Sequence, residues 1–388
     1  MIVVVTIHGI GFQNHPSGLQ ASDGYADNLH AGLCATPQLT GGVLGDDPNR
    51  LAAGGHGPVY VASAYPYNSN STEAGLKRLG TWAGRDVDPT GMPLAPDGAR
   101  FAHVALVYSQ LEETHGDAVA ALDVGLMGAP ALTHYATIGG IARMAFEDLR
   151  AINLHPGAST PSQQVRAQAH QHRGFFSRLL HRAQPADGQQ PAGGPLGALR
   201  TIEDDVAAYV VRNELRERVR AFIRDAVSRI LARPGIDGVI VNGHSNGTVM
   251  GFDLISALSP PSAAHVRLLI TSGCPLRKYV DFMDWGIDAH SFFFMPQQHW
   301  TNFYDKVDPV ADPLQPPVTW KRGHALPDGG GPGLFVVYDP NSGAESHVAV
   351  RDVVVDNIAA GVGGGLPAHN YWDNADFCRQ AAALIASA

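Results

Sequence analysis

The hydrophobic positions of this chain gather in short, nearly continuous apolar runs that alternate with stretches of helical periodicity. The apolar runs rich in β-branched residues are 2–7, 59–64, 103–108, 238–242, 266–271 and 300–304. Strands that are apolar on both sides are typical of a parallel sheet covered on both faces, because each strand then buries all of its side chains. The pattern therefore predicts an α/β fold with a mostly parallel sheet and helices on both faces.

The helical pattern is clearest over 202–231, where apolar residues recur at helical spacing among Arg, Glu and Asp. This predicted helix leads directly into the strand at 238–242. Further helices are expected over 248–258, which is apolar, and over 373–387 near the end of the chain.

Other parts of the chain predict hairpins, loops and insertions. The run 347–355 alternates like a strand, and we expect it to form a hairpin with 334–338. The stretch 41–98 is rich in Gly and Pro and predicts long loops around one strand. Residues 155–197 are rich in Gln, Pro, Gly and Ala, which favours a flexible surface insertion. Residues 277–298 are expected to form a cap or lid.

Composition narrows the class of protein. At 388 residues with 45% hydrophobic and 16% charged residues, the chain is globular, and we expect residues 1–388 to form a single domain. The formal net charge is −9 and no long Lys/Arg run offsets it, so a nucleic-acid partner is not expected. Residues 124–146 are the most apolar long stretch, but Gly, Pro, His and Arg interrupt them, so no transmembrane segment is expected.

Cysteine usage and the first residues favour a reducing compartment. Cys34, Cys274 and Cys378 are scattered without a C-x-x-C motif, which indicates neither a disulfide framework nor a zinc ribbon. The chain begins with a strand-like run that lacks a basic region and a cleavage site. We expect a cytoplasmic protein, the alternative being export without a cleavable N-terminal signal. No spacing requires a metal, no cofactor is expected, and the oligomeric state is left open.

Gly243-His244-Ser245-Asn246-Gly247 matches the pattern G-x-S-x-G. A buried strand runs straight into it and an apolar helical stretch follows, which is the strand, sharp turn and helix of a nucleophile elbow. The glycines have a physical reason, because side chains would collide across a tight turn in which the serine backbone is strained. The context predicts a nucleophile at Ser245, and the alternative is an ordinary Gly-rich turn.

With this motif, the chain resembles the α/β-hydrolase superfamily, in particular its bacterial lipase- and esterase-like members. His8-Gly9-Ile10-Gly11 matches the strand that ends in His-Gly in these enzymes, and Ser272-Gly273-Cys274-Pro275-Leu276 resembles the G-S-P-L that closes a later strand. The resemblance implies an oxyanion hole built from the backbone N–H groups of Ile10 and Asn246. The alternative for His8-Gly9 is a simple strand-ending turn.

A serine nucleophile needs a carboxylate and a histidine, which follow it in the order acid, then histidine, in this fold. Asp305, Asp308 and Asp312 follow the predicted strand at 300–304. We choose Asp308, because Asp-Pro-Val after a strand resembles the acid loop of many lipases and Pro309 stiffens the turn. Asp305 is the runner-up and Asp312 the third candidate, and each of them has a solvated turn or a helix cap as its alternative role.

His324, His347 and His369 lie downstream of the acid and are the candidates for the base. His369 precedes the last predicted helix, where the resemblance implies the histidine of the triad, and it is our choice. His347 begins a strand-like run, so its side chain is expected to belong to the sheet.

The predicted activity is hydrolysis of a small-molecule or lipid ester with an apolar acyl part, through an acyl-enzyme on Ser245. His8, His244, Phe282 and Trp285 are predicted to contact the substrate, the last two because aromatic residues of 277–298 suit an acyl chain; they could equally pack a cap onto the sheet. The same triad serves phospholipases, thioesterases and amidases. A non-catalytic, hydrolase-like binding protein is the alternative from a different class.

Overall fold

The computed structural model describes residues 1–9, 24–62, 81–82, 85–86, 93–108, 213–277, 292, 294–295, 299–308, 310–315, 335–339, 341–364 and 366–388. The predicted insertion at 155–197 and the apolar stretch 124–146 lie outside these residues, as does most of the predicted cap at 277–298. Residues 202–212, the first part of a predicted helix, lie outside them as well.

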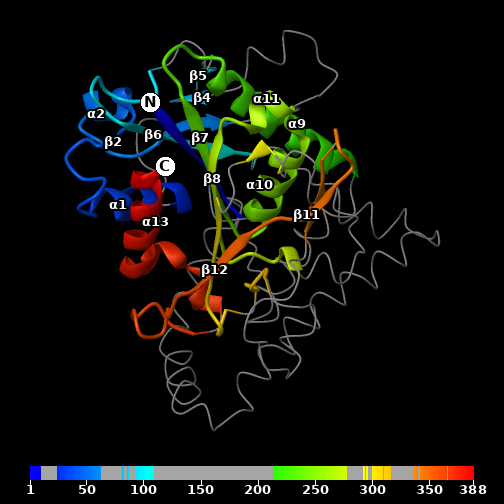
Figure 1. The fold of residues 1–388 in the computed structure, drawn as a ribbon. Coiled ribbons are helices and arrows are strands. Elements are labelled where there is room, and N and C mark those ends of the chain that lie inside the picture. The colour runs from blue at the N-terminus through cyan, green and yellow to red at the C-terminus, as the bar shows by residue number, and fades with distance from the viewer. Residues whose placement is uncertain are drawn as a thin grey trace, which may run out of the picture.

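A parallel sheet forms the centre of the fold (Figure 1). Its strands are β1 (Ile2–Ile7), β2 (Leu44–Gly45), β3 (Val59–Ala62), β6 (Phe101–Val107), β7 (Gly238–His244), β8 (Val266–Ser272), β9 (Trp300–Tyr304) and β12 (Val350–Val354). Their order is β12-β9-β8-β7-β1-β6-β2, with β3 paired to β6, and every pairing is parallel. The predicted mostly parallel sheet is confirmed.

Helices cover both faces of this sheet, as Figure 1 shows. The helices α1 (Tyr25–Cys34) and α13 (Ala375–Ser387) pack on one face, and α9 (Asn213–Leu231) and α10 (Asn246–Ala257) on the other. In β1, Val3 and Val5 belong to the core under α9 and α10, whereas Val4 belongs to the core under α1 and α13. This two-sided burial explains why the strand reads as a continuous apolar run.

Two parts of the chain differ from the prediction. In the stretch 41–98 the sequence predicts long loops around one strand, but the described residues form several strands and a helix. They include β2, the short helix α2 (Pro48–Ala52), β3 and a hairpin of β4 (Thr81–Trp82) with β5 (Arg85–Asp86). Helix α2 begins at a proline, and the preceding Asp47 carboxylate accepts a hydrogen bond from the Asn49 N–H, which is a typical N-cap.

The alternating run at 347–355 forms parts of two strands instead of one. The predicted hairpin is correct only in part: β10 (Val336–Tyr338) pairs antiparallel with β11 (Glu345–His347), which shares only His347 with the predicted run. Residues Val350–Val354, however, form β12 and pair in parallel with β9. Shorter elements complete the described chain: α11 (Pro260–Ala263), η3 (Leu366–His369) and η4 (Tyr371–Asp373).

The strand order has a switch point between β1 and β7. The first strand β1 pairs with β6 on one side and with β7 on the other, and the chain fills the β6 side before it crosses to β7. In open parallel sheets, ligands bind outside the carboxyl ends of the strands at such a point. His8 and Gly9 follow β1 there, and Ser245 follows β7.

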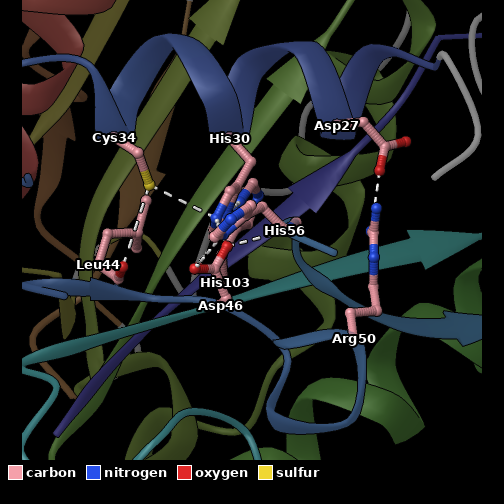
Figure 2. A network of polar contacts seen from close by, with 9 residues as sticks. Asp27, His30, Cys34, Leu44, Asp46, Arg50, His56 and His103 are labelled. Carbon is pink, nitrogen blue, oxygen red and sulfur yellow. Dashed lines mark hydrogen bonds and ion pairs between the residues drawn. The ribbon is translucent and has the colours of Figure 1, made fainter. Parts of the chain in front are cut away.

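A largely buried polar network lies between α1 and the sheet, and Figure 2 shows its members His30, Asp46 and His103. Together with Thr6, which contacts His103, we call them the α1 network. His30 lies in its middle, with Nδ1 2.9 Å from His103 Nδ1 and Nε2 2.9 Å from Asp46 Oδ1. His103 Nε2 lies 2.7 Å from the Thr6 hydroxyl. A carboxylate only accepts hydrogen bonds, so His30 Nε2 carries a hydrogen. Burial, followed by the nearby His30, lowers the pKa of His103 well below its ordinary value, which keeps that ring neutral.

Within the described ranges, no helix has both the length and the apolar character that crossing a membrane requires. In the same ranges, no three His, Cys, Asp or Glu side chains are grouped so that they could hold a metal ion.

Candidate active site

Ser245 occupies the sharp turn between β7 and α10. Its φ is 55° and its ψ −129°, and among the described residues it is the only non-glycine residue with a positive φ. Such a backbone conformation costs on the order of 1–3 kcal/mol for a residue with a side chain and persists only where the surrounding structure enforces it. The strain therefore lies at the residue that the G-x-S-x-G pattern selects.

The two glycines of the pattern allow close backbone contacts. A Cβ on Gly243 would lie 2.7 Å from the Gly247 carbonyl oxygen and 2.8 Å from Thr248 Cα. A Cβ on Gly247 would lie 2.6 Å from the carbonyl oxygen of His8 and would also collide with that of Ile7. Gly247 thus lets the first turn of α10 lie directly against the end of β1, which brings the His-Gly segment and the serine turn together.

The predicted acid and base contact each other. Asp308 follows β9, and His369 ends η3 ahead of α13. Asp308 Oδ2 lies 2.9 Å from His369 Nδ1, and both side chains are buried. Since a carboxylate only accepts, His369 donates its Nδ1 hydrogen, which leaves Nε2 as the proton-accepting nitrogen of the neutral ring.

Further hydrogen bonds keep the Asp308 carboxylate ionised. Burial alone would raise its pKa, but the charge and the hydrogen bond of His369 act against burial, as do hydrogen bonds from the Val310 N–H and the Tyr371 hydroxyl. Together they lower the pKa of Asp308 from 3.8 to about 2. A carboxylate that stays charged is what a histidine needs if it is to become an imidazolium during catalysis.

The other two candidate acids have different partners. Asp305 Oδ1 accepts from the Val307 N–H at 2.8 Å, and its Oδ2 accepts from the Asn357 N–H at 2.6 Å. Burial raises the pKa of Asp305 to about 6 in spite of these two bonds. The backbone of Asp312 joins neighbouring segments, since its N–H donates to the Cys274 carbonyl and its carbonyl accepts from Asn302. Of the three aspartates, Asp308 is the one hydrogen-bonded to His369.

Gly273 lies against the ring of His369. Its φ is +62°, and a Cβ there would lie 2.8 Å from His369 Nδ1 and 2.5 Å from Cε1. A side chain at this position would occupy the space of the imidazole. The segment after β8, whose sequence resembles G-S-P-L, therefore contributes one wall of the site.

Comparison of the chain with protein-family models, with curated proteins and with solved structures finds no match in any of the three. The assignment of the site therefore depends on its geometry.

The remaining predicted site residues are only partly described. Ile10, Phe282 and Trp285 lie outside the described residues. Asn246 opens α10 and is buried, with its backbone beside Ser245. Of the aromatic residues in 277–298, Phe292 and Phe294 are described. The Phe292 ring packs in the core, 5.0 Å from Phe252 between ring centres, and Phe294 is partly buried against the same core.

His8 is buried at the end of β1. Its ring stacks on Tyr108 at 4.3 Å between centroids and 5° between planes, and its Nδ1 hydrogen is donated to the Gly9 carbonyl. Burial lowers the pKa of His8 to about 4, although the hydrogen bond to Gly9 acts in the opposite direction. His8 is therefore neutral at physiological pH. Its predicted contact with the substrate remains a prediction.

His244 contacts the backbone of the predicted base. Its Nε2 lies 2.8 Å from the carbonyl oxygen of His369, and the two ring centres are 4.5 Å apart. Tyr25 and Trp372 pack on the other sides of the ring. The residue that precedes the serine thus connects the elbow to the turn that carries His369.

Two residues of the site, Tyr371 and Asn357, are not among the predicted site residues. Tyr371 donates to Asp308 at 2.9 Å and accepts from the Asp305 N–H at 2.9 Å, so it fixes both segments. Asn357 donates to the carbonyl of Ala368, next to the base. An aromatic pair after His369 was visible in the sequence, but the direction of the Tyr371 hydroxyl depends on how the chain folds back beside β9.

Proposed function

We propose that this protein is a serine hydrolase of the α/β-hydrolase type that cleaves carboxylic esters through an acyl-enzyme on Ser245. The observation that carries the proposal is the strained backbone of Ser245 at the turn between β7 and α10. Backbone strain of this kind clusters at active sites, and a strand-turn-helix serine at a sheet edge presents its hydroxyl to a ligand.

The Asp308–His369 pair supplies the proton transfer for this reaction. His369 Nε2 takes the proton of the Ser245 hydroxyl while the serine oxygen forms a bond to the ester carbonyl carbon. The proton then passes to the alkoxy oxygen as its bond to the acyl carbon breaks. Water repeats the sequence on the acyl-enzyme and regenerates the free serine. Asp308 holds the hydrogen on Nδ1 and stabilises the transient imidazolium.

The negative charge of the tetrahedral intermediate is assigned to two backbone donors, the N–H groups of Asn246 and Ile10. Asn246 is the first residue of α10, where the helix dipole adds a positive partial charge. Removing one such donor typically costs about 3 kcal/mol of transition-state stabilisation. Because Gly247 lets α10 approach the end of β1, the segment after His8 is the natural source of the second donor.

The test is hydrolysis of p-nitrophenyl esters of increasing acyl length, alongside a thioester, a phospholipid and a peptide. We expect ester turnover to exceed the other activities, and Ser245→Ala to lower it by several orders of magnitude, roughly 10⁴-fold or more, without unfolding the protein. The exposed Ser259 offers the matched control Ser259→Ala. Equal turnover of the wild type and Ser245→Ala would contradict the proposal.

A further inference from the structure

His244 carries its hydrogen on Nε2. This nitrogen lies 2.8 Å from the His369 carbonyl oxygen, which can only accept, so the imidazole donates. The ring is fully buried, and burial, followed by the nearby His369, lowers the pKa of His244 well below 6.5. His244 is therefore a neutral hydrogen-bond donor to the backbone of the residue proposed as the base.

The ring of His244 is held in one orientation by its neighbours. Tyr25 of α1 lies 4.7 Å away and Trp372 of η4 5.1 Å away, measured between ring centres. Tyr25 is itself fixed, because the Asn242 side chain donates to its hydroxyl at 2.8 Å. Asn242 also donates to Thr6, which belongs to the α1 network. Residues from α1, β7 and η4 thus help to hold the imidazole in the orientation in which its Nε2 donates to His369.

The turn that carries His369 is tethered at two successive carbonyl groups. Asn357 donates to the carbonyl of Ala368, and His244 donates to the carbonyl of His369. Only the second tether starts from β7, one residue before Ser245. It therefore joins the backbone of the nucleophile to the backbone of the base through one side chain.

We propose that His244 is a positioning residue that sets the separation between Ser245 and His369; this rests on the function proposed above. Positioning matters because a displacement of about 1 Å at a reacting group can cost roughly 100-fold in rate. The neutral state of His244 matters as well. When His369 gains a proton, a second cation 4.5 Å away between ring centres would oppose that charge.

The side chains of Gln and Met are similar in shape, but only Gln has an N–H group that can donate a hydrogen bond. His244→Gln and His244→Met therefore form a matched pair. We expect kcat on a p-nitrophenyl ester to be at least about tenfold higher in His244→Gln than in His244→Met, with KM values within about threefold of each other. Equal kcat values in the two folded variants would overturn the proposal, because the donor would then be irrelevant.

A second readout does not depend on turnover. The hydrogen between His369 Nδ1 and Asp308 should give a downfield proton resonance in NMR spectra, and we expect it to shift or broaden in His244→Met but to persist in His244→Gln. An unchanged resonance in His244→Met would overturn the positioning role. If Ser245 proved not to be a nucleophile, this resonance would still report on His244, so the two failures are distinguishable.

The unmodified protein provides a test that no folding defect can obscure. In ¹⁵N spectra of the histidine-labelled wild type, we expect His244 to be neutral with its hydrogen on Nε2 over the pH range of activity. A hydrogen on Nδ1, or a charged ring at neutral pH, would overturn the proposal whatever the variants do.

Discussion

The Asp308 carboxylate accepts hydrogen bonds from the side chains of His369 and Tyr371 and from the Val310 N–H. The Asp305 carboxylate accepts from the backbone N–H groups of Val307 and Asn357. This difference leads to opposite expectations for two chemically identical changes. Asp308→Asn should leave the fold intact and lower ester turnover by about 10⁴-fold, since the wrong histidine tautomer is then favoured. Asp305→Asn should mainly affect stability: each weakened hydrogen bond costs ~1 kcal/mol, and removal of the buried charge acts in the opposite direction.

Turnover of both variants on one activated ester, with thermal melts, separates lost chemistry from unfolding. Asp312→Asn serves as the third member of the series and should matter least. If Asp305→Asn were folded and inactive while Asp308→Asn worked, the acid assignment would move to Asp305.

Two constraints favour glycine at position 273: its positive φ and the His369 ring, which leaves no space for a Cβ. Gly273→Ala should lower stability by ~1 kcal/mol through the left-handed backbone and should lower kcat by about 100-fold through displacement of His369. Gly343→Ala is the matched control, because Gly343 has a similar φ of +67° with nothing within 4 Å of a Cβ. Equal turnover in the two variants would show that the contact with His369 has no catalytic consequence.

At the scale of elements, the α1 network of Figure 2 joins α1 to β1, β6 and the segment before α2. His30→Leu would leave the Asp46 carboxylate and His103 without the partner they share, so we expect a loss of ~2 kcal/mol in the free energy of unfolding. The double variant His30→Leu/His103→Leu should lose less than the sum of the two single variants, because the two residues belong to one network.

Urea unfolding measures these differences. His56, which bonds Asp46 but is 74% exposed at its side chain, provides the control, and His56→Ala should change stability by no more than about 0.5 kcal/mol. Additive losses in the double variant would contradict the coupling of His30 with His103.

The elements that the sequence predicts best are the central strands. Runs such as 238–242 are buried on both faces, so their apolar character carries the signal by itself. Helix α1 was not predicted, although Tyr25, Leu29 and Leu33 are spaced four apart. Its N-cap is Gly24, without a capping side chain, and buried His30 interrupts the apolar face. The alternation over 347–355 predicts one strand, because alternation alone does not show where a chain leaves one sheet for another.

For the candidate site, the motifs select Ser245, Asp308 and His369, and the structure brings the last two together. The donor of His244, the hydroxyl of Tyr371 and the space left by Gly273 depend on segments far apart in the sequence. Such contacts have no local signature, because each arises from the way several loops pack at one edge of the sheet.

For the molecule as a whole, we expect acid to lower the free energy of unfolding, partly through protonation of Asp308. The pKa of Asp308 in the folded protein is about 2, below the ordinary 3.8. A lowered carboxyl pKa contributes stability that is present above pH 4 and is lost as the pH falls from about 4 to about 2. The shift corresponds to ~2 kcal/mol. Asp305 has the opposite sign, because its pKa is raised to about 6 and its contribution is lost as the pH rises.

Free energies of unfolding at pH 5 and pH 2.5 measure this effect, and comparison with Asp308→Asn removes the contribution of other acids. We expect the wild type to lose ~1.5 kcal/mol more than Asp308→Asn over this interval, because the loss is not complete until the pH falls below about 2. Parallel losses in the two proteins would show that Asp308 has an ordinary pKa in the folded state.

Covalent labelling shows whether Ser245 is an activated nucleophile, on which the proposed reaction depends. A fluorophosphonate forms a stable adduct with a serine only where a base accepts the hydroxyl proton. After incubation of the folded protein and peptide mapping by mass spectrometry, we predict a single adduct on Ser245, absent from heat-unfolded protein and strongly reduced in Asp308→Asn. A folded protein that carries no adduct on Ser245 would contradict the account.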